Sequence, residues 1–253
     1  MFRFARIQVQ WIKNSFTSWF VSKYNVNLNE AVFEDIKEYK NFNDFFTRAL
    51  KAGSRPLSDS KVVSPVDGVV SQYGNIEESM IVQAKGKKYS VEALLADNLK
   101  DDLYSSFATI YLSPKDYHRI HMPFDGRLKS MKYIPGSLFS VNQRTVKDID
   151  QVFARNERLI CNFNTEYGEL ALVMVGAIFV GSMETSWEGQ VTPPYTKSVK
   201  TYDYGSRQID LFKGEELGRF NMGSTIILIM PKRSPDLNLE TGQVLKMGQS
   251  ILN

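Results

Sequence analysis

The sequence contains little of what several classes of protein require. Its 253 residues include one cysteine, Cys161, and two histidines, His118 and His121. A single cysteine excludes an internal disulfide and a cysteine-rich metal site, and it fits a reducing compartment. The His-x-x-His spacing is compatible with zinc, but zinc needs at least one more ligand, and no further His or Cys cluster supplies it. We therefore expect no metal, and any imidazole chemistry must use one of these two side chains.

Long hydrophobic runs and a strong charge of one sign are also missing. The net charge of +3 is too small to predict a nucleic-acid partner. The longest apolar run, residues 170–181 (LALVMVGAIFVG), is well short of the roughly 20 residues that a membrane-spanning helix needs. We interpret this run as a buried strand or strand pair. No signal peptide, internal repeat or low-complexity segment is evident, so we expect a chain that does not cross a membrane but can lie on one.

The composition and the pattern along the chain predict an α+β fold. A hydrophobic content of 43% and a charged content of 23% are typical of a globular protein. From residue 62 onward, short apolar stretches alternate with Gly, Pro and Asp, which indicates a β-rich domain with few helices. The predicted strands lie around residues 69–70, 81–82, 109–112, 170–175 and 225–230. Residues 91–99 are a short helix candidate that Ser90 can cap.

The N-terminal part has a different, helical texture. Residues 27–50 look helical, with Asn41 or Asn43 as a cap, and residues 53–60 form a connector. We therefore place the domain boundary so that residues 1–55 form a helical region and residues 56–253 form the β-rich domain.

The first 23 residues predict a basic amphipathic helix. Their apolar stripe is Ala5, Val9, Ile12, Phe16, Trp19 and Phe20, and their basic residues are Arg3, Arg6, Lys13 and Lys23. Such a helix suits the headgroup region of an anionic membrane. An ordinary surface helix that packs its stripe on the domain explains the same pattern equally well.

Three short segments carry the chemistry. Residues 221–231 contain Gly223-Ser224 ahead of a β-branched apolar run, and glycine lets a neighbouring hydroxyl approach its carbonyl closely. Residues 64–68 read Ser-Pro-Val-Asp-Gly, and residues 117–123 read Tyr-His-Arg-Ile-His-Met-Pro. Each segment also has a plain structural explanation. Gly-Ser-Thr occurs in ordinary turns, Asp67 can bond its own turn backbone, and the two histidines can be structural.

Together, and in their order along the chain, these three segments resemble the phosphatidylserine decarboxylases. The resemblance runs from about residue 40 to the C-terminus. It extends to Phe-Asn-Asp-Phe-Phe-Thr-Arg at residues 42–48, Phe-Ala-Arg-Asn-Glu-Arg at 153–158, the Gly-Ala and Gly-Ser pairs at 176–177 and 181–182, and Gly-Arg-Phe at 218–220. One position departs from the family pattern, because Met222 stands where that family usually has leucine. Methionine has a similar volume, so we expect cleavage to survive.

The resemblance implies a proenzyme that cuts its own backbone between Gly223 and Ser224. It assigns Asp67, His121 and Ser224 to a self-cleavage triad, in which His121 is held by Asp67 and takes the proton of Ser224. Ser224 then becomes a covalent pyruvoyl group, the cofactor, and the products are a large chain (1–223) and a small chain (224–253). The pyruvoyl group would form a Schiff base with the substrate amine and accept the electrons left when carbon dioxide departs. The resemblance assigns His118 to this second stage, as proton donor to the α-carbon.

The resemblance further implies the substrate and the setting. The substrate would be phosphatidylserine, converted to phosphatidylethanolamine on a membrane surface, by a homodimer peripheral to the cytoplasmic side of a bacterial inner membrane. The absence of a long targeting presequence favours the bacterial setting over an organellar one. No nucleic-acid partner is implied.

Several assignments stay open at this point. Arg119 can meet a phosphate or carboxylate, or form a structural salt bridge. Residues 133–142 can line an acyl groove or belong to the core, and residues 155–158 can be a structural or dimer element. Three other functions compete: a pyruvoyl decarboxylase of a soluble amino acid, a non-catalytic lipid-binding relative, and a serine hydrolase using Ser224, His121 and Asp67. The last is weakened because no Gly-x-Ser-x-Gly elbow surrounds Ser224.

Overall fold

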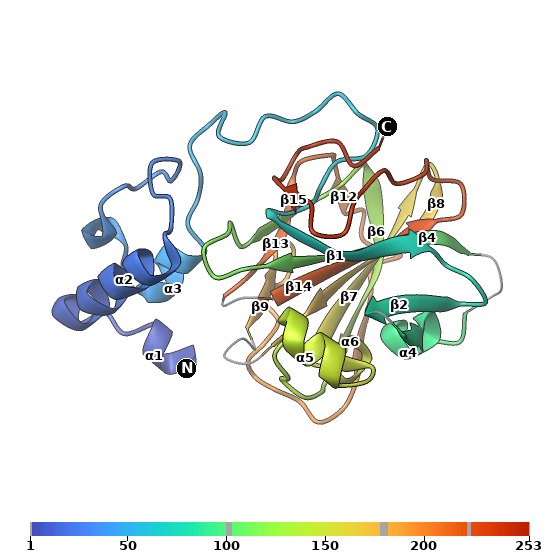
Figure 1. Cartoon of the computed structure of the whole chain (residues 1–253), viewed down its shortest axis with the longest axis horizontal. Coiled ribbons are helices and arrows are strands. Elements are labelled where there is room, and N and C mark those ends of the chain that lie inside the picture. The colour runs from blue at the N-terminus through green and yellow to red at the C-terminus, as the bar shows by residue number, and fades with distance from the viewer. Residues whose placement is uncertain (1, 85, 100–102, 178–181, 222–223, 253) are drawn as a thin grey trace.

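The computed structural model of the chain describes residues 2–84, 86–99, 103–177, 182–221 and 224–252. A small helical region formed by the N-terminal residues lies beside a larger domain built from strands (Figure 1). This arrangement confirms the predicted α+β class and the low helical content of the β domain.

The helical region contains four short elements. They are α1 (Phe2–Ala5), α2 (Gln10–Tyr24), the 3-10 helix η1 (Ile36–Glu38) and α3 (Phe42–Phe46). Asn25 ends α2 in a left-handed conformation with φ 52°, and its N–H donates to the carbonyl of Val21. Asn41, one of the two predicted caps, accepts a hydrogen bond from the Asp44 N–H at 2.9 Å and so starts α3.

The prediction that residues 27–50 are helical is wrong for most of that segment. The Asn27 side chain accepts from the Asn29 N–H at 3.1 Å, a local turn contact that competes with helix formation. Ala31 then forms an isolated antiparallel bridge with Leu50, which closes the segment into a loop. Only the 3-10 turn and α3 remain helical within it.

An aromatic cluster holds the helical region together. Phe20 of α2 packs against Phe42, Phe45 and Phe46 of α3, with ring centroids 5.0–6.1 Å apart. The predicted apolar stripe is therefore partly correct: Ala5 and Phe20 are buried. Val9 and Trp19, by contrast, are 48% and 49% exposed. Lys13 is buried instead, and its ammonium donates to the carbonyl of Ile36 at 2.8 Å.

The described strands form three antiparallel sheets. The strands of the largest sheet are β1 (Gly68–Asn75), β4 (Tyr104–Leu112), β6 (Gly126–Ile134), β7 (Arg158–Thr165), β8 (Gly168–Val175), β11 (Lys200–Asp203), β12 (Asp210–Leu211), β14 (Ser224–Pro231) and β15 (Val244–Leu245). Their order is β11-β6-β7-β8-β14-β4-β1-β15, and β12 also pairs with β6. The second sheet has the order β10-β9-β13-β5, from β5 (Arg119–His121), β9 (Met183–Thr185), β10 (Gly189–Gln190) and β13 (Glu216–Phe220). The third is the hairpin of β2 (Met80–Ala84) and β3 (Lys87–Ser90).

Strand β14 lies inside the large sheet and is covered on both faces. It pairs with β8 on one side and β4 on the other. Its side chains alternate between two core clusters: Ile226, Leu228 and Met230 enter one, and Ile227 and Ile229 enter the other. Burial on both faces explains why the predicted strand is a continuous apolar run rather than an alternating one.

The two faces of the large sheet have different covers. The second sheet packs on one face, because Ile120, Met183, Leu217 and Phe220 share a core cluster with Ile226. The other face is covered by the hairpin β2–β3 and by α4 (Val91–Leu95), α5 (Gln143–Asp148) and α6 (Val152–Arg155). The helix α4 confirms the prediction at residues 91–99, although it is shorter, and Ser90 caps it by accepting from the Ala93 N–H at 3.1 Å.

Within the second sheet, Gly218 allows β13 to approach β9 closely. A side-chain carbon at this position would lie 2.2 Å from the carbonyl oxygen of Glu184, a distance that real contacts do not reach. The close approach matters because β13 leads directly into β14. The segment that the sequence marks for cleavage therefore joins the two sheets.

None of the described helices combines the length and the apolar composition that crossing a bilayer requires.

Candidate active site

The site is built around the point where β14 begins. Ser224 is the first residue of β14 and pairs with Leu112, the last residue of β4. Gly223 and Met222, predicted to precede the cut, lie outside the described residues, and so does the side chain of Ser224. The described residues on either side of this point define what surrounds it.

The chain before the cleavage segment is fixed by backbone hydrogen bonds. The Phe220 N–H donates to the carbonyl of His118 at 3.0 Å, and the Asn221 N–H donates to the carbonyl of Ser182 at 3.0 Å. The approach to Ser224 therefore runs directly past His118.

The Asn221 side chain adds three further hydrogen bonds. Its Nδ2 donates to the Ser182 hydroxyl at 2.7 Å and to the Glu184 carboxylate at 2.9 Å, and its Oδ1 accepts from Asn43 Nδ2 at 3.0 Å. Asn221 is 2% exposed. A buried amide with all of these bonds formed holds its backbone in one place. Asn43 belongs to α3, so α3 helps to fix the position of Asn221.

His118 lies beside the start of β14. Its Nε2 is 3.1 Å from the carbonyl oxygen of Ser113, the residue after Leu112. A carbonyl only accepts, so this contact places the proton on Nε2 and the lone pair on Nδ1. Among the described residues, Nδ1 has no hydrogen-bond partner although the side chain is fully buried.

The environment of His118 strongly disfavours its charged form. Burial, and next the positive charge of Arg48, lower the pKa of His118 to about 3, and the carbonyls of Ser113 and Pro114 oppose this only in part. The ring of Phe46 stacks on the imidazole with centroids 4.0 Å apart and 23° between the planes. His118 is therefore neutral at neutral pH, and one of its ring nitrogens has no partner among the described residues.

His121 is held differently. Its backbone N–H donates to the carbonyl of Pro65 at 2.9 Å, which places it beside the segment that contains Asp67. Its Nδ1 is 2.8 Å from the carbonyl oxygen of Gly214, and its Nε2 is 3.1 Å from the Tyr117 hydroxyl. The carbonyl fixes the proton on Nδ1, so Nε2 carries the lone pair and accepts from Tyr117. Burial is the largest effect on the pKa of His121 and lowers it.

Asp67 is an ionic hub rather than a direct partner of His121. Its Oδ1 accepts from Arg55 Nε at 2.8 Å and from the Met247 N–H at 2.9 Å, and its Oδ2 accepts from Arg55 at 2.5 Å and from Lys246 at 2.9 Å. The Asp67–His121 hydrogen bond that the resemblance implies is not formed, because both His121 nitrogens and both carboxylate oxygens have other partners. Asp67 still acts on His121 through its negative charge, which raises the pKa of His121 against the larger effect of burial.

The hub connects distant parts of the chain. Arg55 also donates to both oxygens of Glu30, at 3.0 and 2.9 Å. The network thus joins the helical region at Glu30, the connector at Arg55, and the C-terminal segment at Lys246 and Met247. Removing one member leaves a buried partner charge without compensation.

The remaining predicted residues have structural partners. Arg119 donates to Glu216 at 2.8 Å and to the Thr47 carbonyl at 2.9 Å, so of the two open roles it fills the salt bridge. Asn156 is fully buried and bonds the backbone of Phe139 and Gly176. Tyr133 donates to Glu157 at 3.0 Å.

Sequence reasoning did not single out several residues that touch the site. They are Phe46, Arg48, Arg55, Tyr117 and Asn221. Phe46, Arg48 and Tyr117 stand inside motifs that carry the family resemblance, so their positions contained a signal. Asn221 opens the segment 221–231, but its partner Asn43 is far away in the sequence. Arg55 lies outside the motifs and acquires its role only from distant partners such as Asp67.

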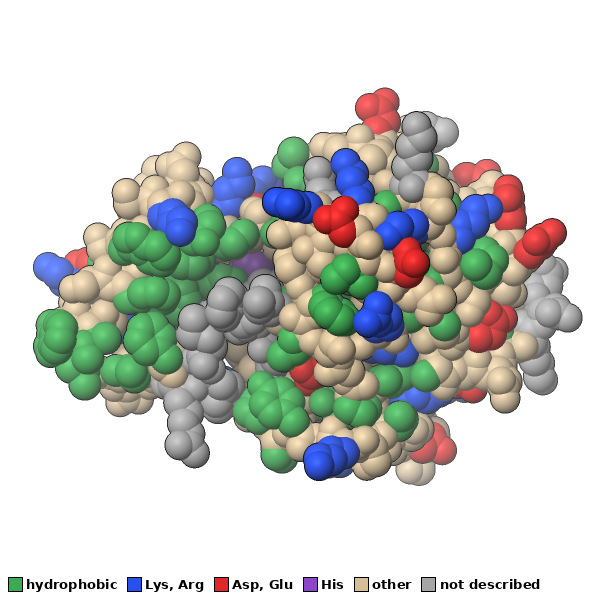
Figure 2. All heavy atoms as spheres, turned by 60° about the horizontal axis from the view of Figure 1, so that its bottom comes forward, with side chains coloured by type: hydrophobic (Ala, Val, Ile, Leu, Met, Phe, Trp, Pro, Cys, Tyr) green, Lys and Arg blue, Asp and Glu red, His purple; other side chains and the backbone are tan. Residues whose placement is uncertain are grey.

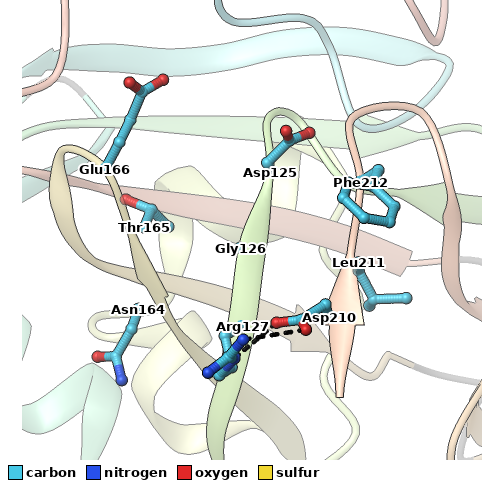
Figure 3. Close-up of a pocket in the computed structure, with 9 residues that line it drawn as sticks. All are labelled: Asp125, Gly126, Arg127, Asn164, Thr165, Glu166, Asp210, Leu211 and Phe212. Atoms are coloured by element: carbon cyan, nitrogen blue, oxygen red, sulfur yellow. Dashed lines mark hydrogen bonds and ion pairs between the residues drawn. The ribbon is translucent and has the colours of Figure 1, made fainter. Parts of the chain in front are cut away.

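An open cavity of about 570 Å³ lies elsewhere (Figure 3). Asp125, Arg127, Glu166 and Asp210 contribute its charged lining, and Arg127 pairs with Asp210 at 2.6 and 3.1 Å. The strand register places this cavity at the end of the large sheet opposite to Ser224, since Arg127 pairs with Asn164 whereas Val175 pairs with Thr225. It is not part of the candidate site. Among the residues that the structure describes, no three His, Cys, Asp or Glu side chains gather to hold a metal ion.

Comparison with known proteins shows the family. The family model described as phosphatidylserine decarboxylase matches residues 42–253. Proteins named phosphatidylserine decarboxylase proenzyme are similar along most of their length. The one from Methylobacillus flagellatus is 50% identical over 233 residues, 91% of this chain and 83% of the relative. That from Acidovorax ebreus is 51% identical over 92% of this chain and 84% of the relative. One from Pseudomonas putida is 50% identical over 98% of this chain and 89% of the relative.

The fold and the site define a β-rich protein in which a buried histidine, His118, lies beside the start of an inner strand that begins with a serine. With the family model covering most of its length, this chain belongs to the phosphatidylserine decarboxylase family.

The ionic hub at Asp67 generates a stability prediction. Burial raises the pKa of Asp67. Hydrogen bonds from Arg55 and from the Met247 N–H lower it by more than burial raises it, so the pKa of Asp67 lies below its ordinary value. A carboxylate of this kind stabilises the fold above its unfolded-state pKa, about 3.9. That contribution is lost as the pH falls through the folded-state value. In an uncleaved Ser224→Ala background, Asp67→Asn should lower the free energy of unfolding near neutral pH by about 2 kcal/mol or more.

Chemical denaturation at several pH values measures this effect. The difference between the Ser224→Ala protein and its Asp67→Asn derivative should shrink once the pH is well below 4, by the same linkage. Asp210→Asn, which breaks the exposed pair with Arg127, is the matched control and should change stability little. An Asp67→Asn variant as stable as its parent at neutral pH would show that the hub does not support the fold.

Proposed function

We propose that this chain decarboxylates phosphatidylserine to phosphatidylethanolamine through a pyruvoyl group that it makes from its own Ser224. One observation carries the proposal: in a member of this family, the ring of His118 is held against Ser113, next to the strand partner of Ser224. Gly223 and Ser224 form the peptide bond that would be cut. The relatives are named as proenzymes, which supports self-cleavage.

Self-cleavage would start with the Ser224 hydroxyl. A base removes its proton, the oxygen attacks the carbonyl carbon of Gly223, and the amide becomes an ester with a free Ser224 amine. Loss of the Ser224 α-proton then expels the Gly223 carboxylate and leaves dehydroalanine. Tautomerisation to the imine, followed by hydrolysis with water, releases ammonia and leaves the ketone of the pyruvoyl group.

His121 is the proposed base for this step. Its Nε2 carries the lone pair, and Tyr117 is the group that occupies it. The Tyr117 hydroxyl must therefore swing aside or pass the proton on. The imidazolium that forms would be stabilised by the charge of Asp67, acting at a distance rather than through a hydrogen bond.

His118 is the proposed proton donor of the decarboxylation step. When present, the pyruvoyl carbonyl supplies an electron sink for the pair left on the substrate α-carbon when carbon dioxide departs. Nδ1 of His118 is free among the described residues, so this atom is the one that can hold a proton for that carbon. Because the pKa of His118 is about 3, Nδ1 carries no proton at neutral pH. It would first take a proton from the substrate ammonium group or from water and then pass it to the α-carbon.

The small chain, residues 224–253, would stay bound after the cut. Residues 225–230 are buried between β4 and β8, and burial of this much apolar side-chain surface is worth several kcal/mol. Lys246 and Met247 add bonds to Asp67 of the large chain. No covalent link is needed to keep the two chains together.

The helical region is the proposed membrane contact. Trp11, Trp19, Phe4 and Val9 are 73%, 49%, 40% and 48% exposed, and hydrophobic side chains gather on the face of this region shown in Figure 2. The Lys23 ammonium lies 4.6 Å from the centroid of the Trp19 ring, so a positive charge lies next to the aromatic surface. Exposed aromatic rings with a basic neighbour suit the headgroup layer. This surface favours a lipid substrate over a soluble amino acid, the nearest alternative.

Two further parts of the proposal concern the setting. The relatives come from bacteria, which supports peripheral attachment to the cytoplasmic side of an inner membrane. A homodimer is proposed from family membership.

Intact-mass analysis under denaturing conditions tests self-cleavage. The purified protein should give two chains, 1–223 and 224–253, because the Ser224 hydroxyl cuts the preceding peptide bond. Ser224→Ala has no hydroxyl and should give one chain. A single uncut wild-type chain that still decarboxylates phosphatidylserine would refute the proposal.

The two histidine variants should separate the two steps. His118→Ala should be cut normally and lose turnover by at least about a hundredfold, because it lacks the proton donor. His121→Ala should stay uncut, because it lacks the base. Gel analysis of the chains, together with release of carbon dioxide from phosphatidylserine, measures both effects. Normal cutting in both variants would show that the division of labour is wrong.

Co-sedimentation with phosphatidylserine vesicles tests the membrane contact. The double variant Trp11→Ser, Trp19→Ser should bind vesicles at least about tenfold more weakly, since each lost ring removes apolar area from the interface. Turnover of a short-chain, water-soluble phosphatidylserine should be unchanged. Phe212→Ser, at a ring 59% exposed on the β domain, is the control and should bind like the wild type. Equal vesicle binding by all three proteins would exclude this surface as the contact.

A further inference from the structure

We propose that Phe46 of α3 is a positioning residue for the decarboxylation step, because its ring fixes the plane of the His118 imidazole, whose Nδ1 has no partner among the described residues. The inference rests on the proposed role of His118 and assigns a task to the helical region beyond membrane contact. The orientation of this one side chain is set by a contact on its face and a contact at its edge.

The imidazole is held at two places. Phe46 covers one face at a centroid distance of 4.0 Å, and the Ser113 carbonyl holds Nε2 at 3.1 Å. Turning the ring over would place Cε1 where Nε2 lies and Cδ2 where Nδ1 lies, and it would break the Ser113 contact. Tilting the ring would break the stack. The side chain is fully buried and Phe46 is 3% exposed, so neither lost contact would be replaced by water.

The helix that carries Phe46 is itself anchored to the segment around His118. Arg48 donates to the carbonyls of Lys115 and Asp116 at 2.8 and 3.3 Å, and the Thr47 carbonyl accepts from Arg119 at 2.9 Å. These bonds lie on either side of His118 in the sequence. The position of Phe46 relative to the imidazole is thus set by the same backbone that carries the imidazole.

Packing behind Phe46 supports this placement. Phe20 of α2 contacts the Phe46 ring at 6.0 Å and Phe42 contacts it at 6.0 Å. In Figure 2 a histidine side chain is visible at the junction between the helical region and the β domain. A catalytic imidazole at such a junction depends on both parts for its orientation, and small errors of orientation are costly in catalysis.

The test compares Phe46→Leu with Phe45→Leu. Phe45 lies on the same helix, is fully buried, and packs on Phe20, Tyr39 and Phe42. Both variants lose an aromatic ring from the same cluster, so both should lose a similar amount of thermal stability. Phe46→Leu should still be cut into two chains but show kcat lowered about tenfold or more, with KM little changed. Phe45→Leu should keep kcat within about twofold. Phe46→Tyr, which restores a flat ring, should recover most of the turnover.

Nitrogen-15 NMR provides a readout that does not depend on turnover. With only two histidines in the chain, their ring signals can be assigned from His121→Ala. In the uncleaved Ser224→Ala protein, His118 should show the Nε2–H tautomer alone, and Phe45→Leu should preserve it. Phe46→Leu should show a mixture of tautomers or an exchange-broadened ring. If Phe46→Leu does not fold, Phe46→Met takes its place in the test, because methionine is a flexible side chain close to leucine in size and has no ring.

Two results would overturn the inference. One is wild-type kcat with a single His118 tautomer in Phe46→Leu. The other is an equal loss of kcat in Phe46→Leu and Phe45→Leu, which would mean that α3 acts only through the stability of the cluster. Failure of the proposed function is distinguishable, because a wild-type protein without decarboxylase activity would leave the tautomer comparison intact.

Discussion

The structure depends on the pairing of β14 between β4 and β8. This register places Ser224 opposite Leu112, at the point where the chain leaves the second sheet and enters the large one. It also buries residues 225–230 on both faces. The same interaction therefore fixes where the backbone would be cut and why the piece after the cut would remain in place. Because β14 is an inner strand, moving its register by one residue would exchange the side chains of two core clusters, which strongly specifies the position of Ser224.

Around this fixed point, the site draws on parts of the chain that are far apart in sequence. The helical region supplies Phe46 and Asn43, the β4–β5 segment supplies both histidines, and the C-terminal segment supplies Lys246 and Met247 to the Asp67 hub. The two histidines have opposite tautomers: His118 carries its lone pair on Nδ1 and His121 carries it on Nε2. Two equivalent side chains three residues apart are thereby made chemically different by the carbonyl that each one faces.

The sequence predicted the parts of the fold that local pattern controls. The apolar run at 225–230 is the inner strand, Ser90 caps α4, and Asn41 caps α3, since each of these depends on neighbours in the chain. The helix expected at 27–50 failed because a long-range bridge between Ala31 and Leu50 overrides local helical preference. The site residues were named from motifs, but the partners of Asp67 were not foreseen: Arg55, Lys246 and Met247 are brought to it only by the tertiary fold. A hydrogen bond between Asp67 and His121 was expected from the resemblance, and the ionic hub stands in its place.

The proposal that the chain makes its own electron sink has one direct chemical consequence at the start of the small chain. Tandem mass spectrometry of the N-terminal peptide of the 224–253 fragment, taken from active protein, reads the chemical identity of position 224. We expect a pyruvoyl group, with no free amine and a carbonyl that hydride reducing agents convert to an alcohol. An active protein whose position 224 remains an unmodified serine would contradict the central claim.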